Sequence, residues 1–283
     1  MAWAIGGLII KPISTKFSSL SINSIKLSIG WIILTTIMAL WGKLGSLTFV
    51  GWHSTAYIIG SGILGLAIGA TLQIKSLSLI DISKVYPIAF SSWFFFTALI
   101  AAIFLGEAIT HYTILGAILI ASGITLLSSA SKVRGKEEAP NTDSAKGIIF
   151  ALLAGLCWAG GTNLVKLGLY EVDPLMVNVI RLPFAILLLA TLTLSRGEAS
   201  EYRRYNHRAL IQVGISGFLG QAVGEVLFFI SVQLAGATKA AILSSTSPLF
   251  IAPLSIIFLK EKLTKRVILG TIACALGILL TIM

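Results

Sequence analysis

Glu225 is the residue whose surroundings in the sequence point most directly to chemistry. It lies near the middle of GISGFLGQAVGEVLFFISV (214–232), an apolar stretch without a cation. If this stretch crosses a bilayer, a charged side chain near its centre costs about 2.5–3.5 kcal/mol. Glu225 is therefore expected to face a cavity, pair with a cation from elsewhere or stay protonated. Gln221 shares its face one turn earlier, and the two predict either a site for a substrate amine or a coupling proton, or a structural bond to a neighbouring helix.

Basic residues recur at matching places in the two halves of the chain. Lys166 and Arg181 stand 15 residues apart, as do Lys11 and Lys26. These cations could bind an anionic substrate at the mouth of a cavity, or they could extend along their alkyl chains to the lipid headgroups. Asn163, three residues before Lys166, could join the same polar face. Both interpretations are kept for all four cations.

Aromatic side chains form the third group of candidates. Tyr86, Trp93 and Trp158 could line a cavity and stack on an aromatic or apolar substrate, although such residues also pack between helices or lie at the membrane interface. Enzyme chemistry is not predicted, because the cysteines and histidines do not cluster and most of the 11 acids lie in loops. No catalytic residue, metal or cofactor is expected.

The composition indicates which elements must position these residues. Hydrophobic residues make up 56% of the chain and charged residues 11%, against about 25% charged residues in soluble domains. Apolar runs near 20 residues recur throughout, long enough to cross a membrane, and predict an all-α integral membrane protein. Breaks at polar, glycine and proline clusters predict ten helices at about 2–12, 21–41, 55–74, 81–105, 110–129, 145–166, 174–195, 209–232, 237–259 and 264–282. The basic residues lie singly or in short groups between these runs, so no nucleic-acid partner is expected.

The chain contains an internal repeat. FLGEAITHYTILGAILIASGITLL (104–127) and FLKEKLTKRVILGTIACALGILLT (258–281) share 12 of 24 residues, and WAIGGLIIK (3–11) matches WAGGTNLVK (158–166). The offset between matching residues is 155 early in each half and 154 at the end. This pattern indicates that one set of helices has been duplicated.

Five helices in each copy place the second copy upside down relative to the first. The predicted organisation is a repeat at 1–129, a linker at 130–144 and a repeat at 145–283. Lys and Arg gather in the loops of one side, and by the positive-inside rule this makes the linker cytoplasmic and both termini external. The first helix is expected to be truncated, since fewer helical residues precede Trp3 than precede Trp158. Inverted repeats are typical of secondary transporters that hold their substrate near the midplane.

Two repeated features are interpreted as structural. Glu107 and Glu261 each follow an apolar helix, and inversion puts them at opposite membrane faces, so they cannot share one site. Each is expected in the first turn of the next helix, where its charge complements the helix dipole for ~0.3–1 kcal/mol; the alternative is an intramembrane acid that carries protons. The GxxxG pairs at 65–69 and 220–224 are expected to let helices approach closely.

Together these motifs resemble the drug/metabolite transporter superfamily, in particular its EamA-type ten-helix members. The resemblance rests on a tryptophan and a lysine in the first helix of each half, a basic residue 15 positions later, FLGE or FLKE before an ILG helix, and PLFIAPLSIIFLKE at 248–261. The first half departs from the pattern, with Trp93-Phe94 where the second half has Ser247-Pro248. The resemblance implies a multi-pass cell-membrane protein with a central cavity between its halves.

The function that the resemblance implies is secondary transport by alternating access. The expected substrate is a small organic metabolite such as an amino acid or a related compound, moved outward. The residues expected around it are Glu225, Gln221, Asn163, Lys166, Arg181, Trp158, Tyr86 and Trp93. Membrane lipids and a coupling proton are the other expected partners, and the chain is expected to act as a monomer or homodimer. The alternative is a lipid-carrier flippase, or a membrane binding protein that does not transport, on the same scaffold.

Overall fold

The computed structural model describes residues 1–45, 50–105, 110–129, 142–168, 172–231, 233–234, 244, 247–261 and 264–282. Every regular element in these ranges is a helix. Glu107 and most of the predicted linker lie outside the described residues, so the expectations for them stay predictions.

The first half has a short helix followed by four longer helical runs. Its elements are α1 (Ala2–Ile10), α2 (Ser19–Leu40), α3 (Trp52–Ser61), η2 (Gly62–Gly69), α4 (Ala70–Leu79), α5 (Ile82–Leu105) and α6 (His111–Ser129). The elements α3, η2 and α4 form one continuous run of 28 residues. Ser18 begins α2 as its N-cap, because its side chain accepts a hydrogen bond from the Ser21 amide.

The second half has helical runs of similar length. Its elements are α7 (Thr142–Gly168), α8 (Pro174–Ser195), η4 (Glu198–Ser200), α9 (Glu201–Arg204), α10 (His207–Gly217), η5 (Phe218–Glu225), α12 (Ser247–Leu259) and α13 (Lys265–Ile282). The run that begins with α10 continues through η5 to Ser231. Side chains of Asp173 and Asn206 cap α8 and α10, and Pro174 occupies the first turn of α8, where its missing N–H is not needed.

Within the described ranges, five helical runs are long and apolar enough to cross a membrane. They are Ser19–Leu40, Trp52–Leu79, Thr142–Gly168, Pro174–Ser195 and His207–Ser231. Large apolar side chains also cover the outside of the molecule; Phe104 and Leu187, for example, are 78% and 66% exposed. Such a surface is unfavourable in water and suits contact with lipid tails.

Three differences from the predicted helices are larger than shifts of two or three residues at a helix end. The third run was expected to end at residue 74 but continues to Leu79. In this added turn the Ser76 hydroxyl is buried and donates a 2.7 Å hydrogen bond to the carbonyl of Gly147, so a polar residue is accommodated within the helix. The short helices η4 and α9 were not predicted, since their charged sequence resembles a loop. The predicted helix 237–259 is described at residue 244 and from Ser247 onward, and residues 235–243, 245 and 246 lie outside the described ranges.

Both GxxxG segments are π-helical, in η2 and η5. π turns are rare and occur frequently at functional sites, and the glycine pattern predicted close packing rather than this geometry. The packing itself occurs at Gly65, since a Cβ on Gly161 of α7 would lie 3.2 Å from its Cα. At Gly220 it does not, because a Cβ there would meet no atom of the described residues within 4 Å. Gly220 instead borders open space.

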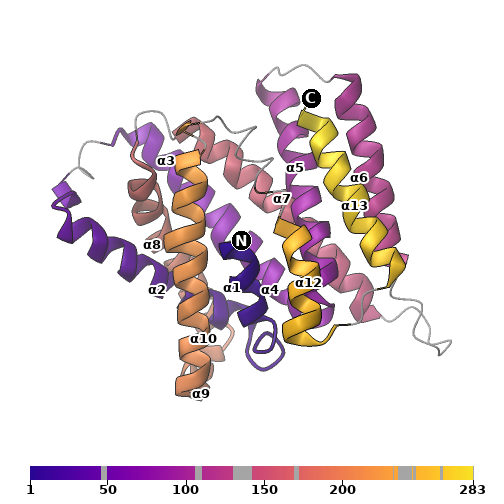
Figure 1. Ribbon diagram of the computed structural model, residues 1–283. Coiled ribbons are helices and arrows are strands. Elements are labelled where there is room, and N and C mark those ends of the chain that lie inside the picture. The colour runs from indigo at the N-terminus through magenta and orange to yellow at the C-terminus, as the bar shows by residue number, and fades with distance from the viewer. Residues whose placement is uncertain are drawn as a thin grey trace.

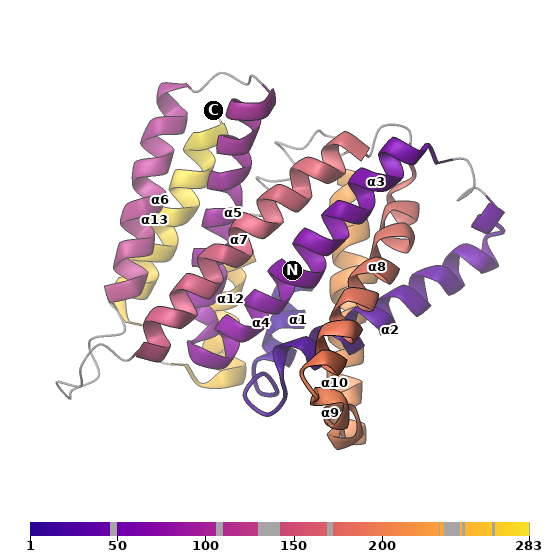
Figure 2. The same cartoon turned by 180° about the vertical axis from the view of Figure 1, so that it is seen from behind.

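The helices form two groups on either side of a central pair of oblique helical runs. Figure 1 shows α6 and α13 side by side next to α5, whereas α2, α8 and α10 lie on the opposite side. From behind, α7 and the α3–α4 run cross the molecule obliquely between these groups (Figure 2). The helices α6 and α13 touch through small residues, since a Cβ on Gly123 would lie 2.6 Å from Cys274 Sγ.

Several loops meet at one end of the bundle, at the bottom of Figure 1. This end contains the loop 11–18 after α1, the helix α9 and the turn between α12 and α13. We call it the basic end, because these segments carry Lys11, Lys16, Arg203, Arg204 and Lys260. It is the end for which the positive-inside rule predicts a cytoplasmic location.

Candidate functional site

A cavity of about 120 Å³ lies at the centre of the molecule. It is bordered by residues of α1, α2, α3, η2, α4, α5, α7, α8, α10 and η5 and of the helical turn after η5. Its size is sufficient for several water molecules or a small organic molecule. The short helix α1 borders it along one face, with Trp3, Gly6, Gly7 and Ile10 at positions i, i+3, i+4 and i+7. This spacing places all four residues on one stripe of the helix.

Aromatic rings form one wall of the cavity. The ring of Trp3 lies 5.6 Å from that of Phe228, and the ring of Phe90 lies 5.7 Å from those of Trp93 and Trp158. These distances are typical of favourable aromatic pairs. The wall exposes flat apolar faces that a bound molecule can stack against.

Hydrogen bonds hold these rings in place. The indole N–H of Trp3 donates to the Gly220 carbonyl at 3.2 Å, and that of Trp93 donates to the Thr162 hydroxyl at 2.9 Å. The Tyr86 hydroxyl donates to the Trp3 carbonyl at 2.7 Å. Because their polar atoms are satisfied, the rings have fixed orientations toward the cavity.

Glu225 forms an ion pair with Arg181. The Arg181 Nη2 atom donates to Glu225 Oε2 at 2.6 Å, and the two side chains are 5% and 17% exposed. Arg181 Nε also donates to Asn178 Oδ1 at 2.9 Å, and its guanidinium lies 4.8 Å from the centre of the Phe229 ring. Glu225 thus obtains from α8 the cation that its own helix lacks, which is one of the three outcomes that the sequence predicted.

Two further polar residues border the cavity without complete partners. Lys26 is 9% exposed and is attracted by the charge of Glu225, but within the described ranges its ammonium group donates no hydrogen bond. Gln221 is 4% exposed, and its Oε1 atom accepts no hydrogen bond from any described residue. Buried polar atoms normally have partners, so these two can receive groups of a bound molecule.

The structure brings six of the eight predicted residues to the cavity: Glu225, Gln221, Arg181, Trp158, Tyr86 and Trp93.

Asn163 and Lys166 lie elsewhere. The face of α7 that borders the cavity carries Trp158, Gly161, Thr162 and Val165, again at i, i+3, i+4 and i+7, and the two predicted residues fall beside this stripe. The Asn163 amide donates to the carbonyl of Ala159, one turn earlier in the same helix, and Lys166 is exposed.

Two other charged residues with open interpretations have structural contacts at the basic end. Lys11 donates to the carbonyls of Leu77 and Ile80, both at 2.6 Å, and so caps the C-terminal end of α4. Glu261 was expected at the start of the following helix, but it accepts from the amides of Ile82 and Ser83 at 3.0 and 3.3 Å. It therefore caps α5 in the other half of the chain, because the turn after α12 brings it to the free amides of that helix.

The sequence did not single out several residues of the cavity, although the repeat contains a signal for them. Each of the eleven cavity residues from the second half stands 155 positions after a cavity residue of the first half. Trp158 follows Trp3 in this way, and Phe228 follows Gln73. Applying the offset to Gln221, Glu225 and Trp158 would have identified their counterparts.

Contacts between the halves follow the same register. A Cβ on Gly69 would lie 2.8 Å from Trp158 Cδ1, and one on Gly224 would lie 2.6 Å from Trp3 Nε1. Both the glycines and the tryptophans are 155 positions apart. Each half thus packs its tryptophan against the π-helical segment of the other half.

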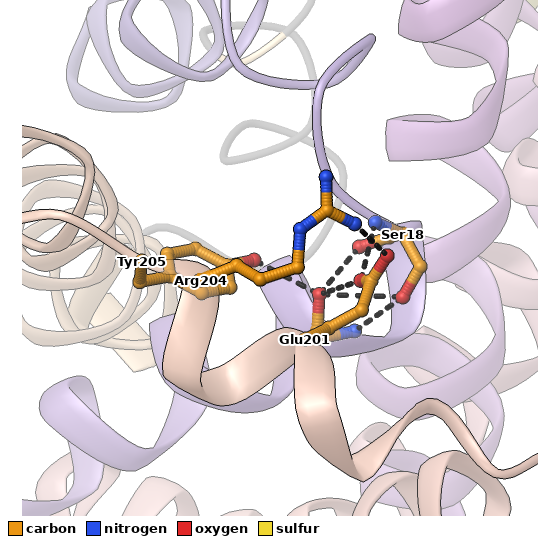
Figure 3. A network of polar contacts seen from close by, with 5 residues as sticks. Ser18, Glu201, Arg204 and Tyr205 are labelled. Carbon is orange, nitrogen blue, oxygen red and sulfur yellow. Dashed lines mark hydrogen bonds and ion pairs between the residues drawn. The ribbon is translucent and has the colours of Figure 1, made fainter.

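A polar network joins the two halves at the basic end (Figure 3). Glu201 Oε2 accepts from the Ser18 amide at 2.8 Å and from the Ser21 hydroxyl at 3.0 Å, while the Tyr205 hydroxyl lies 2.9 Å from Ser21 Oγ. Burial by itself would raise the pKa of the Glu201 carboxyl, but the hydrogen bonds from Ser18 and Ser21 and the charge of Arg204 outweigh it and hold this pKa below its usual value. Burial raises the pKa of the Tyr205 hydroxyl. The network fixes α9 to the start of α2.

A comparison with protein families decides what kind of protein this architecture is. The model of the EamA-like transporter family matches residues 1–129 and 145–283. The chain belongs to the EamA-like transporter family. The membership confirms the predicted resemblance and identifies a multi-pass membrane transporter.

Individual relatives agree with this membership. The "Probable glucose uptake protein GlcU" of Priestia megaterium is 31% identical over 255 residues, which cover 88% of this chain and 85% of the relative. The protein lin0215 of Listeria innocua, also named for sugar uptake, is 31% identical and covers 74% of this chain and 72% of its own. A crystal structure with 16% identity superimposes with a TM-score of 0.65 over 99% of this chain and 95% of its own, which shows a shared fold.

Proposed function

We propose that this transporter moves a sugar or sugar derivative through the central cavity by alternating access. The observation that carries the proposal is the combination of a wall of aromatic rings with polar side chains that lack complete partners. A sugar presents both a ring face of C–H groups, which stacks on aromatic side chains, and hydroxyl groups, which need donors and acceptors. Two relatives named for glucose and sugar uptake support the same substrate class.

The expectation of an exported amino acid finds no support among these relatives. Their names describe uptake, and we propose uptake as the direction of transport here. The charges of the cavity also suit an amino acid poorly, because the carboxylate that could bind its amine, Glu225, is already paired with Arg181 at 2.6 Å.

We further propose that the halves are inverted repeats of five helices each, at 1–129 and 145–283, joined by a cytoplasmic linker at 130–144. The support is the common 155-residue register of the cavity residues and of the contacts between tryptophans and glycines. Related halves that meet around a cavity provide two similar sets of gates, which can open alternately. In this proposal the network of Glu201 and Ser18 belongs to the cytoplasmic gate.

Glu225 is the place where a proton would couple to transport. Among the described residues of the cavity it is the only acid, and a proton there would release Arg181 from its ion pair. We expect Glu225→Gln to abolish uptake driven by a pH gradient in proteoliposomes while sugar exchange without a gradient continues. Gradient-driven uptake at the wild-type rate would exclude this role.

Counterflow in proteoliposomes tests the substrate class. Vesicles that contain the full chain are loaded with unlabelled glucose and diluted into a trace of labelled glucose, and parallel vesicles are loaded with amino acids. We expect transient accumulation of the labelled sugar and none of the amino acids. Exchange of amino acids without exchange of any sugar would contradict the proposal.

A further inference from the structure

The charged residues around the cavity are unequally paired. Among the described cavity residues the cations are Lys26 and Arg181, and the only acid is Glu225. Arg181 forms a direct ion pair with this acid, at 2.6 Å. Lys26 is attracted by the same carboxylate but has no hydrogen-bond acceptor of its own within the described ranges. The cavity therefore holds one more positive charge than negative charge.

The repeat shows where the missing negative charge would be. Lys26 and Arg181 are counterparts, 155 positions apart, and both border the cavity. The counterpart of Glu225 is Ala70, which also borders the cavity. The second half thus supplies an acid for its cation, whereas the first half has a methyl group at the same place.

A cation without a counter-charge is unfavourable inside a membrane protein, because neither lipid nor the packed helices can replace its hydration. Only 9% of Lys26 is exposed, so bulk water does not solvate its charge. A bound anionic group beside Lys26 would supply the second negative charge and form a charge-assisted hydrogen bond.

A second unpartnered group indicates the rest of the ligand. Gln221 Oε1 borders the same cavity, is buried and accepts no hydrogen bond from the described residues. It needs a donor, which an ionised carboxylate or a fully ionised phosphate does not provide but a hydroxyl does. A ligand that satisfies both Lys26 and Gln221 therefore combines an anionic group with a hydroxyl group.

We propose that the preferred substrate is an anionic sugar derivative, whose carboxylate or phosphate binds Lys26 while a hydroxyl donates to Gln221. The inference rests on the proposed function and narrows its substrate class. The aromatic wall holds the ring of the sugar, and the pair of Arg181 and Glu225 stays intact beside it.

Equilibrium binding to the full chain in lipid nanodiscs tests this by isothermal titration calorimetry. The probes are D-glucose, D-glucuronate and glucose 6-phosphate, which separate a neutral sugar, a carboxylate and a phosphate. Wild-type protein is expected to bind one of the anionic sugars at least about 10-fold more tightly than glucose. Lys26→Gln is expected to lower the affinity for the anionic sugar by about 10- to 100-fold and the affinity for glucose by less than about threefold.

Two variants and a control keep the result independent of folding. Ala70→Glu supplies an internal acid for Lys26 and is expected to lower the affinity for the anionic sugar in the same way. Lys26→Arg is expected to retain binding of the anionic sugar. Lys75→Gln removes an equal charge from the exposed side of α4 and is expected to change nothing.

Equal affinity of the wild type for glucose and for both anionic sugars would overturn the inference and leave the proposed function standing. An equal loss of affinity for glucose and for the anionic sugar in Lys26→Gln would also overturn it. A wild type that binds none of the three would contradict the proposed function itself, and the inference with it.

Discussion

Replacing Glu225 by glutamine removes the negative charge from a buried pair and leaves the Arg181 guanidinium without a counter-charge. Breaking a buried pair in this way costs about 3–5 kcal/mol. The lower end of that range applies, since Glu225 keeps 17% of its side chain exposed to the cavity and Arg181 retains its hydrogen bond to Asn178. We therefore expect Glu225→Gln to lower the free energy of unfolding by about 3 kcal/mol.

A double-mutant cycle separates the ion pair from other effects. The double variant Arg181→Gln/Glu225→Gln contains no charge at either position, so its loss of stability is expected to be smaller than the sum of the single losses by about 2 kcal/mol. The free energies are measured by titration of the purified protein in mixed micelles with a denaturing detergent, followed by circular dichroism.

An exposed ion pair serves as the control. Lys43 and Asp173 lie 3.2 Å apart, with side chains that are 50% and 37% exposed, so Lys43→Gln is expected to cost less than about 1 kcal/mol. A loss of stability in Glu225→Gln no greater than that of this control, or strictly additive losses in the cycle, would contradict a stabilising ion pair between Arg181 and Glu225.

Three further predictions concern packing, pH and topology. Gly69→Ala is expected to cost about 1–3 kcal/mol, because its Cβ would lie 2.8 Å from Trp158 Cδ1, whereas Gly220→Ala, with open space around it, is expected to cost less than about 0.5 kcal/mol; thermal unfolding of both variants checks this. A lowered pKa means that Glu201 stabilises the fold fully above the usual carboxyl value of about 4.3 and loses its contribution as pH falls through the folded value. Glu201→Gln should therefore be less stable than wild type near neutral pH, with a difference that shrinks below that value, and a difference independent of pH would contradict this. A reporter fused after Met283 is expected outside the cell, and a cytoplasmic signal would contradict the proposed orientation.

The elements could largely be predicted, because length and apolar composition determine a membrane helix almost by themselves. The ends of α8 at Pro174 and Ser195 agree with the sequence, since a proline and polar residues mark them. The π turns of η2 and η5 could not be predicted. Glycine permits close packing, but whether a turn takes an extra residue depends on the helices that press against it.

The candidate site was predicted in part. Glu225 could be found because an acid in an apolar run is conspicuous. Its partner Arg181 lies 44 residues away, and the two meet only because α8 and η5 border the same cavity. Lys26 and Lys11 looked equivalent in the sequence. The structure turns the first toward the cavity and the second toward the end of α4, since the direction of each side chain depends on its place in the fold.

Transport through the cavity is the central claim, and Gly220→Phe tests it most directly. Gly220 borders the cavity, and a Cβ there would meet no described atom within 4 Å, so a side chain at this position has room to leave the helix and extend into the space for the substrate. Sugar counterflow is measured for wild type, Gly220→Ala and Gly220→Phe in proteoliposomes with equal amounts of folded protein. We expect exchange by wild type and Gly220→Ala and none by Gly220→Phe. Exchange by Gly220→Phe at the wild-type rate would contradict this expectation.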